Sequence, residues 1–473
     1  TSLKKRSLEV HKRMSNYKIE TSSFRDSSGF LFYENEILYR QINKSYSEHY
    51  DFLMNSGLYE KLVSLNLLVS HSEVDHAPPK KNNAYKIIQP ELIPFISYPY
   101  EWSFTQLKQA ALTTLQIQKI AMKYEMVLKD ATSYNVQFKE GKPIFIDTLS
   151  FEKYEEGKPW QAYRQFCQHF LAPLALMSHK DIRLGQLFRI FIDGIPLDLA
   201  SKLLPLKTRS MFSLLTHIHA HAKSQKHFEN KKVDAKKSHL SRRSFEGVIA
   251  SLNSGISKLK WSFEDTEWGD YYSDTNYSDF AFNDKKNLIQ KFIEKNNPKN
   301  VWDLGANTGV FSRLSSDHEI PTVAFDIDPV AVEKNYQIVL EKDEKNLLPL
   351  LLDLTNPSPY LGWENNERKS FLDRSPVDMV LALALIHHLA ISNNVPLENI
   401  SRFFKKICKN LVIEFIPKSD SQVQRLLVTR EDIFNDYDIE NFEEEFEKNF
   451  IILESSKIGN SERVIYLMKN KTL

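Results

Sequence analysis

The chain has 473 residues and a mass of 55.2 kDa, which exceeds one ordinary domain and predicts two or three. Its net charge of +1 argues against a nucleic-acid-binding surface over the whole chain, and having Cys167 and Cys408 as the sole cysteines excludes a disulfide framework or a cysteine metal site. No apolar run resembles a signal peptide or a membrane span, so we expect a cytoplasmic protein.

Short apolar runs separated by turns predict a small antiparallel sheet near the N-terminus. We expect strands over residues 29–33, 36–42, 85–88 and 91–97. A hinge at residues 98–101 then leads into a long helix over residues 105–125.

Three polar residues follow this helix at a spacing that is typical of phosphotransfer sites. Asp130 and Asn135 are five residues apart, and Asp147 lies twelve residues further on, after a strand–turn–strand unit. The region resembles the kinase-like folds of aminoglycoside phosphotransferases and lipopolysaccharide kinases. That resemblance implies that Asp130 accepts the proton of the attacking hydroxyl, while Asn135 and Asp147 hold magnesium against the phosphates of ATP. Ordinary turn and cap roles, where Asn and Asp are common, are the alternative.

The kinase-like pattern is incomplete, which leaves the role of this part open. No His-Arg pair precedes Asp130, no Phe-Gly follows Asp147, and the expected cover over the phosphates is short of glycine. Arg40 stands near the place of the nucleotide-binding lysine, and Lys44 lies just beyond that strand. The region is therefore either an active phosphotransferase or a degenerate kinase-like domain that binds a ligand without chemistry.

A change of composition marks the boundary between two domains. Residues 222–244 hold eight lysines and arginines against two acidic residues. We therefore expect a kinase-like domain over residues 1–220, a basic connector over 221–259 and a second domain over 260–473. A contact with nucleic acid or a phosphate-rich ligand is the alternative for the basic segment, which offers Phe228 as its one aromatic residue for base stacking.

A glycine loop sits between an expected strand and an expected helix of the second domain. Residues 303–309 read Asp-Leu-Gly-Ala-Asn-Thr-Gly, follow the apolar run 300–302 and precede a helix-like stretch over 310–315. Glycines permit a tight turn and let the backbone approach a ligand closely. The spacing lacks the Lys-Ser/Thr of a P-loop and the Gly-x-Gly-x-x-Gly of a dinucleotide fold.

Carboxylates stand at the ends of the next two expected strands. Residues 322–325 lead into Asp326, about 20 residues past the glycine loop, and residues 348–352 lead into Asp353 and Leu354. An acidic residue at the first of these places can accept hydrogen bonds from both hydroxyls of a ribose. A plain helix or turn cap is the alternative for Asp353.

Two histidines follow the fourth expected strand, which covers residues 377–385. His387 and His388 are candidates for a base, because histidine titrates near neutral pH, and a structural role is the alternative. Glu414 ends the fifth expected strand, and the loop after it, with Lys418 and Asp420, either lines an acceptor pocket or lies in solvent. A final hairpin is expected over residues 450–453 and 463–468.

These motifs, in this order, resemble class I S-adenosylmethionine-dependent methyltransferases over residues 260–473. Continuous apolar strands separated by helices imply a parallel sheet covered on both faces, and the closing antiparallel hairpin is typical of this fold. The expected fold class is therefore α/β, with a Rossmann-like methyltransferase sheet and an N-terminal α+β kinase-like domain. The whole chain also resembles bacterial nodulation-protein-related methyltransferases and the bifunctional kinase–methyltransferases of surface polysaccharides.

The resemblance implies S-adenosylmethionine (SAM) as the cofactor. The residues that it places around SAM are Asp303, Gly305, Asn307, Gly309, Asp326, Asp353 and Leu354. Aromatic side chains ahead of the loop, Tyr271, Tyr272 and Tyr277, are candidates to face the sulfonium cation, and ordinary packing is their alternative. His388, and after it His387, would act as a base or orient the acceptor, and no metal cluster is evident in this half.

We therefore expect a SAM-dependent methyltransferase for O- or N-methylation of a small molecule or glycan, with a kinase-like domain that binds the acceptor or a nucleotide. A bifunctional kinase–methyltransferase, with ATP and magnesium in the N-terminal domain, is one alternative. A non-catalytic nucleotide-binding scaffold is the other. We expect no membrane span and no nucleic-acid partner, and the sequence names neither a protein partner nor an acceptor.

Overall fold

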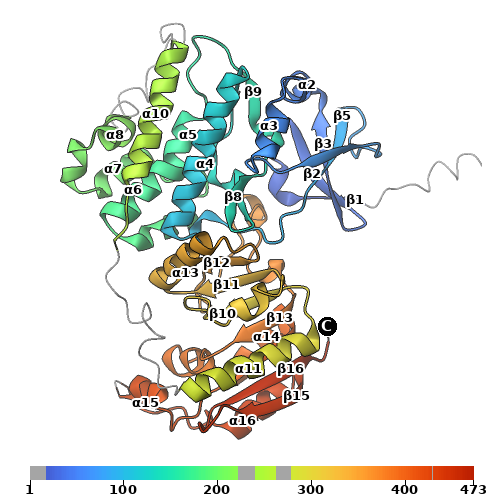
Figure 1. Ribbon diagram of the computed structural model, residues 1–473, viewed down its shortest axis with the longest axis vertical. Coiled ribbons are helices and arrows are strands. Elements are labelled where there is room, and N and C mark those ends of the chain that lie inside the picture. The colour runs from blue at the N-terminus through green and yellow to red at the C-terminus, as the bar shows by residue number, and fades with distance from the viewer. Residues whose placement is uncertain (1–16, 222–239, 263–278, 429, 473) are drawn as a thin grey trace, which may run out of the picture.

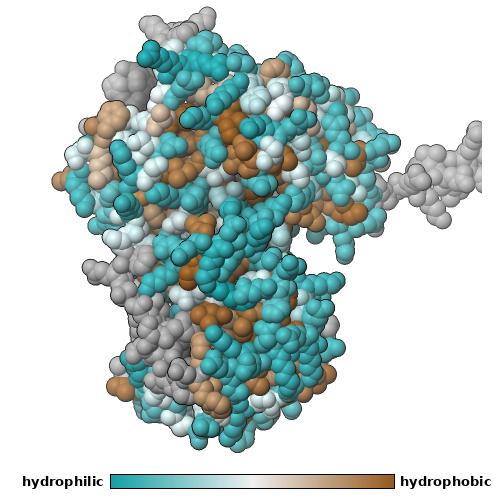
Figure 2. Space-filling model, viewed as in Figure 1, coloured by the Kyte–Doolittle hydropathy of each residue, from teal (hydrophilic) through white to brown (hydrophobic). Residues whose placement is uncertain are grey.

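The computed structural model describes residues 17–221, 240–262, 279–428 and 430–472. An N-terminal part with a small sheet and many helices is stacked along the long axis on a C-terminal part built around a seven-stranded sheet (Figure 1). Figure 2 shows a mostly hydrophilic surface, with patches of hydrophobic side chains near the junction of the two parts. Within the described ranges, every helix is too short or too polar to span a lipid bilayer.

A five-stranded antiparallel sheet opens the chain, in the order β1-β2-β3-β5-β4. Its strands are β1 Tyr17–Ile19, β2 Gly29–Glu34, β3 Ile37–Asn43, β4 His71–Val74 and β5 Ala84–Pro90, with helices α2 Ser47–Asn55 and α3 Leu58–Ser64 between β3 and β4. The strand predicted over residues 91–97 is wrong, because this segment is irregular and Pro94 has no N–H to donate to a ladder. The strands β1 and β4, which were not predicted, complete the sheet.

The long helix α4, Phe104–Lys123, follows the sheet and begins with a capping box. The hydroxyl of Ser103 accepts from the N–H of Gln106, whose side chain accepts from the N–H of Ser103. After α4, two short antiparallel pairs form between β6 Met126–Leu128 and β9 Phe151–Lys153, and between β7 Val136–Lys139 and β8 Lys142–Phe145. The helices of this part are α5 Tyr163–Phe166, α6 Ala172–His179, α7 Leu197–Leu203, α8 Phe212–Leu214 and α10 Arg242–Lys258.

The C-terminal sheet has the order β12-β11-β10-β13-β14-β16-β15. Its strands are β10 Val301–Leu304, β11 Thr322–Asp326, β12 Leu347–Leu351, β13 Val377–Ala382, β14 Cys408–Phe415, β15 Phe450–Lys457 and β16 Val464–Asn470. The first five strands are parallel, and β16 runs antiparallel between β14 and β15. This mixed sheet has the class I methyltransferase arrangement, so the Rossmann-like sheet and closing hairpin predicted from sequence are confirmed.

Helices cover both faces of this sheet, because alternate residues of its central strands point to opposite sides. On one face, Ile289 and Phe292 of α11 (Asp279–Asn296) pack with Val301. On the other, α14 (Leu397–Ile407) and α16 (Ile439–Glu447) bury their apolar residues. The helix α13 (Pro329–Lys342) lies on the same face as α11 and packs on β11 and β12. The carboxyl ends of the five parallel strands therefore open at one edge of the sheet.

Two element boundaries near this edge differ from the prediction. The helix expected from residue 310 is reduced to α12, Arg313–Ser316, because the loop continues in turns past Gly309. The fourth strand ends at Ala382 rather than at residue 385, since Ala384 takes a φ of 49° and donates its N–H to the carboxylate of Glu414 at 2.9 Å.

Buried polar contacts join the two parts of the molecule. The guanidinium of Arg374 pairs with the carboxylate of Glu101, at 2.5 and 2.9 Å, and both side chains are almost fully buried. At the first turn of α4, where N–H groups have no helical partner, Glu333 accepts from the N–H of Thr105 at 3.0 Å and from its hydroxyl. The side chain of Gln106 also donates to the carbonyl of Pro349 at 3.0 Å.

Candidate functional site

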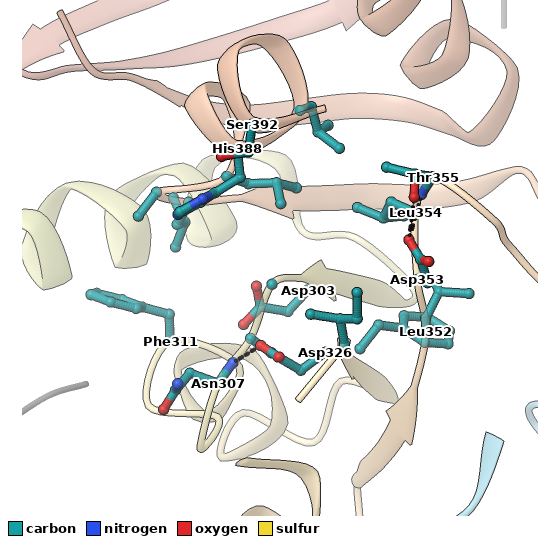
Figure 3. Close-up of a pocket in the computed structure, with 18 of the residues that line it drawn as sticks. Asp303, Asn307, Phe311, Asp326, Leu352, Asp353, Leu354, Thr355, His388 and Ser392 are labelled. Atoms are coloured by element: carbon teal, nitrogen blue, oxygen red, sulfur yellow. Dashed lines mark hydrogen bonds between the residues drawn. The ribbon is translucent and has the colours of Figure 1, made fainter. Parts of the chain in front are cut away.

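The loop after β10 is shaped by backbone conformations that favour glycine. Gly305 and Gly309 both have a φ of 78°, and Asn307, a residue type that tolerates this region, has a φ of 51°. The N–H groups of Gly305 and Ala306 donate to the carbonyl of Phe325 at 2.9 Å, which ties the loop to the end of β11. The loop therefore folds back over the carboxyl end of the sheet (Figure 3).

Gly309 is held where a side chain does not fit. A Cβ at this position would lie 2.6 Å from the side-chain nitrogen of Asn335 and 2.8 Å from the guanidinium of Arg313. Arg313 is itself fixed, because it bonds the carboxylate of Glu344 at 2.8 and 2.9 Å and the carbonyl of Thr308 at 2.7 Å. The second glycine of the motif is thus required by close packing as well as by its φ angle.

We expect Gly309→Ala to lower stability by about 1–3 kcal/mol, because it adds backbone strain and displaces the Asn335 and Arg313 side chains. The measurement is thermal unfolding. Gly247→Ala in α10 is the matched control: no heavy atom lies within 4 Å of its added Cβ, and alanine favours a helix. An unchanged unfolding temperature in Gly309→Ala would contradict the steric argument.

Asp326, at the carboxyl end of β11, binds the glycine loop through its carboxylate. Its Oδ2 accepts from the N–H of Asn307 at 2.7 Å, and its Oδ1 accepts from the N–H of Asp328 at 2.9 Å. Burial raises the pKa of Asp326 to about 6, against the effect of these hydrogen bonds. A carboxylate has about four acceptor sites, so Asp326 can still accept from a ligand in the cavity that it lines.

This cavity, of about 240 Å³, brings together the sequence-predicted residues of the strand ends. Those that line it are Asp303, Gly305, Asn307, Asp326, Asp353, Leu354 and His388, and Gly309 shapes the loop without lining it. The predicted Tyr272 and Tyr277, with Tyr271, lie outside the described residues. Phe282, Phe311 and Leu385 add apolar walls.

Two of the carboxylates also hold local structure. Asp303 is buried and accepts from the hydroxyl of Ser312 at 2.6 Å, and burial raises the pKa of Asp303 to about 7. Asp353 accepts from the N–H of Thr355 at 2.8 Å and from its hydroxyl at 2.7 Å (Figure 3). Asp353 therefore caps a turn and also lines the cavity, so its role as a cap does not exclude contact with a ligand.

His388 lines the cavity, whereas His387 does not. His388 begins a short π-helical turn, His388–Ser392, and faces the carboxylates from the opposite wall of the cavity (Figure 3). Burial lowers the pKa of His388 to about 4, so its imidazole is neutral near pH 7. His387 is buried behind it and is not among the lining residues; burial, and then the neighbouring His388, lower the pKa of His387.

A buried ion-pair network closes one end of the cavity and was missed in the sequence. Lys285 of α11 lines the cavity, pairs with Glu414 at 2.6 Å and lies 4.5 Å from the ring centre of Phe311. Arg463 lies 3.6 Å from Glu414 and pairs with Asp420 at 2.7 Å. Glu414 is therefore a buried structural partner, and Asp420 of the loop after β14 takes part in the same network.

The three N-terminal candidates are brought together near β8. Asp147 accepts from the N–H of Leu149 at 3.0 Å and the hydroxyl of Ser150 at 2.5 Å, and the side-chain amide of Asn135 donates to the same hydroxyl at 3.2 Å. Burial, and then the nearby charge of Asp147, raise the pKa of Asp130. Over the part of the chain that the structure describes, no three His, Cys, Asp or Glu side chains are grouped as a metal site needs.

Comparisons with known proteins place the chain among its relatives. No family model matches it. In solved structures it is similar to the bifunctional kinase-methyltransferase WbdD, at 16% identity and a TM-score of 0.28 over 44% of this chain and 42% of that one. It is also similar to the N-methyltransferase NodS from Bradyrhizobium japonicum WM9, at 11% identity and a TM-score of 0.30 over 41% of this chain and 98% of that one.

The sequence relationship is much stronger than these structural similarities. Over 454 residues the chain is 36% identical to nodulation protein NoeA from Rhizobium meliloti (strain 1021), and the alignment covers 94% of each chain. An identity of this size over nearly the full length of both proteins shows common descent. The chain belongs to the family of nodulation protein NoeA.

Proposed function

We propose that the C-terminal part is a SAM-dependent methyltransferase. The observation that carries the proposal is the convergence of the glycine loop, Asp326 and Asp353 on one cavity at the carboxyl ends of a methyltransferase-type sheet. When bound there, SAM would supply an electrophilic methyl group on its sulfonium.

The residues around the cavity take distinct roles in this proposal. The carboxylate of Asp326 receives the hydroxyls of the ribose, and Asp353 and Leu354 lie beside the adenine. Asp303, Gly305 and Asn307 form the wall opposite the π-helical turn, with the loop backbone close to the cofactor. Each role follows from a side chain or backbone segment that lines the cavity.

His388 is proposed as the residue that orients the methyl acceptor. Its neutral imidazole can accept a hydrogen bond or a proton from an acceptor hydroxyl, or steer the lone pair of an amine. His387, buried behind it, holds the turn in place rather than reaching the acceptor. The acceptor class is a small molecule or glycan that carries a hydroxyl or amino group, and the site assists the transfer by positioning.

The N-terminal part is proposed to be a kinase-like accessory domain over residues 1–220, followed by a connector over 221–259 and the methyltransferase domain over 260–473. Within the connector, α10 packs on α4 and so extends the N-terminal part. An antiparallel sheet followed by a helical layer, with Asp130, Asn135 and Asp147 gathered near a cleft, supports this assignment. In this proposal the accessory domain binds the acceptor or a nucleotide.

The raised pKa of Asp326 gives the proposal a pH signature. The ionised carboxylate accepts both ribose hydroxyls, so we expect affinity for S-adenosylhomocysteine (SAH) to be constant above pH 7 and to fall as the pH drops through about 6. Calorimetric titrations at a series of pH values measure this. Asp326→Asn, which does not titrate, is expected to flatten the profile; an equal fall in that variant would assign the effect to another group.

The enzymatic step is tested with methyl-tritiated SAM and a fractionated extract of small molecules and glycans. We expect label to enter a fraction with the wild-type protein and not with Asp326→Ala. If SAM binds but no label is transferred from any fraction that contains hydroxyl or amino acceptors, a non-catalytic scaffold is the better description.

A further inference from the structure

A second cavity, of about 360 Å³, lies where the two parts of the molecule meet. One wall comes from β2, β3 and the segment after β5, and the opposite N-terminal wall includes Tyr134 and Ile146. The third wall belongs to the C-terminal part, which contributes residues 367–369 with Asp373 and Arg374. The cavity is thus a composite of both halves.

Ion pairs and hydrogen bonds fix the C-terminal wall of the cavity to the N-terminal part. Glu367 binds the guanidinium of Arg25 at 2.5 and 2.9 Å, across the junction. Lys369 donates its backbone N–H to the hydroxyl of Tyr98 at 2.8 Å and its ammonium to Glu20 at 2.9 Å. Arg368, between these two anchors, is therefore held in place at the edge of the cavity.

Two guanidinium groups on the cavity wall keep unused hydrogen-bonding capacity. The guanidinium of Arg368 lies 4.2 Å above the ring centre of Tyr134, and its Nε is buried without a hydrogen-bond partner. The Nε of Arg40, which also lines the cavity, is buried without a partner too. Neither side chain can lose its charge, and both present the flat donor set that binds phosphate.

Part of the remaining lining is apolar and suits a planar ring, while the acidic residues Glu20, Glu91, Glu367 and Asp373 also line the cavity. Leu31, Leu38 and Ile88 come from the N-terminal sheet, and Ile146 faces them from the strand end after β8. An apolar slot with arginines at its edge matches the chemistry of a nucleotide, which joins a flat base to charged phosphates.

Asp147, which the kinase resemblance assigns to magnesium together with Asn135, is poorly arranged to bind a metal ion. The guanidinium of Arg40 pairs with Asp147 at 2.5 Å and with Asp26 at 3.2 Å, so a permanent cation already neutralises the carboxylate assigned to the metal. Both oxygens of Asp147 accept further hydrogen bonds, from Leu149 and Ser150. Magnesium demands near-octahedral oxygen ligands, and the acceptor sites of Asp147 are largely taken by Arg40, Leu149 and Ser150.

We propose that the composite cavity binds a nucleoside diphosphate or triphosphate without a divalent cation, with Arg368 of the C-terminal part as a phosphate ligand. The inference rests on the accessory role proposed above and deepens it, because it names a metal-free nucleotide as the ligand. Arg40 takes the charge-neutralising role of the metal, and the nucleotide contacts both halves at once.

The test titrates ADP and ATP into the full-length protein by calorimetry, once in EDTA and once in magnesium. We expect affinities within about twofold of each other in the two buffers, and a loss of at least tenfold in Arg368→Gln. Arg402→Gln, an exposed arginine of the same half, is the control and should leave affinity unchanged. Absence of binding in both buffers, binding that requires magnesium, or full affinity in Arg368→Gln would overturn the proposal.

A second variant covers the case in which Arg368→Gln does not fold. Asp147→Asn would abolish a metal-dependent site, whereas we expect it to keep or raise nucleotide affinity because it frees Arg40; a tenfold loss contradicts the proposal. SAH is titrated into the same samples, so failure of the methyltransferase assignment is seen separately: wild-type protein that binds ADP but not SAH would leave this inference intact.

Discussion

Asp326→Ala is expected to weaken SAH binding by about 10- to 150-fold. Its carboxylate is buried and lines the cavity at the end of β11, where it can receive the ribose hydroxyls. A hydrogen bond to a charged group contributes about 1.5–3 kcal/mol, and each 1.4 kcal/mol is a tenfold change in affinity. Calorimetry with the purified variant measures the loss.

Two further variants separate binding from loop structure. Asp326→Ala also removes the acceptors for the N–H groups of Asn307 and Asp328, whereas Asp326→Asn retains one oxygen and should lose less affinity. Asp317→Ala, at an exposed carboxylate after α12, is the matched control and should bind SAH as the wild type does. If Asp326→Ala binds SAH with wild-type affinity, Asp326 does not bind the ribose.

Glu101→Gln is expected to destabilise the protein by about 3–5 kcal/mol, because it leaves the buried guanidinium of Arg374 without its counter-charge. The pair joins the two parts of the molecule, and the carboxylate also accepts from the hydroxyl of Ser358. Thermal unfolding measures the effect, with an expected decrease of roughly 6–15 °C.

The exposed pair between Lys142 and Asp343 also crosses the junction and provides the control. Lys142→Ala should change stability by no more than about 1 kcal/mol, because exposed ion pairs contribute little. The double variant Glu101→Leu with Arg374→Met should recover part of the loss, since it removes both buried charges together. Equal unfolding temperatures in Glu101→Gln and Lys142→Ala would show that burial of the Arg374 pair is unimportant.

The methyltransferase sheet was predictable because its signals are local. The central strands are mostly apolar, and Gly305, Asp326 and Asp353 stand at strand ends at characteristic spacing. Parallel strands bring their carboxyl ends to one edge, so these residues had to meet near one cavity once the strand order was known. The π-helical turn at His388 has no such signal, and it decides which histidine reaches the cavity.

The features that were missed depend on contacts between distant parts of the chain. Lys285 looked like one of many helix lysines, although Ile289 and Phe292 mark its side of α11 as buried, and its partner Glu414 lies 129 residues away. Arg368 of the C-terminal part lines a cavity that is otherwise formed largely by the N-terminal part, and no local sequence pattern predicts that the two parts meet there. The segment at 91–97 was predicted wrongly for a local reason. Its apolar content favoured a strand, but Pro94 cannot donate a ladder hydrogen bond, and the segment is irregular.

A structure of the full-length protein crystallised with SAH tests the central claim most directly. We predict SAH in the cavity at the carboxyl ends of β10, β11 and β12, with both ribose hydroxyls within hydrogen-bond distance of Asp326 and the sulfur on the side of His388. Failure to bind SAH at millimolar concentration, or an adenosine bound away from the loop at Gly305, would contradict the account.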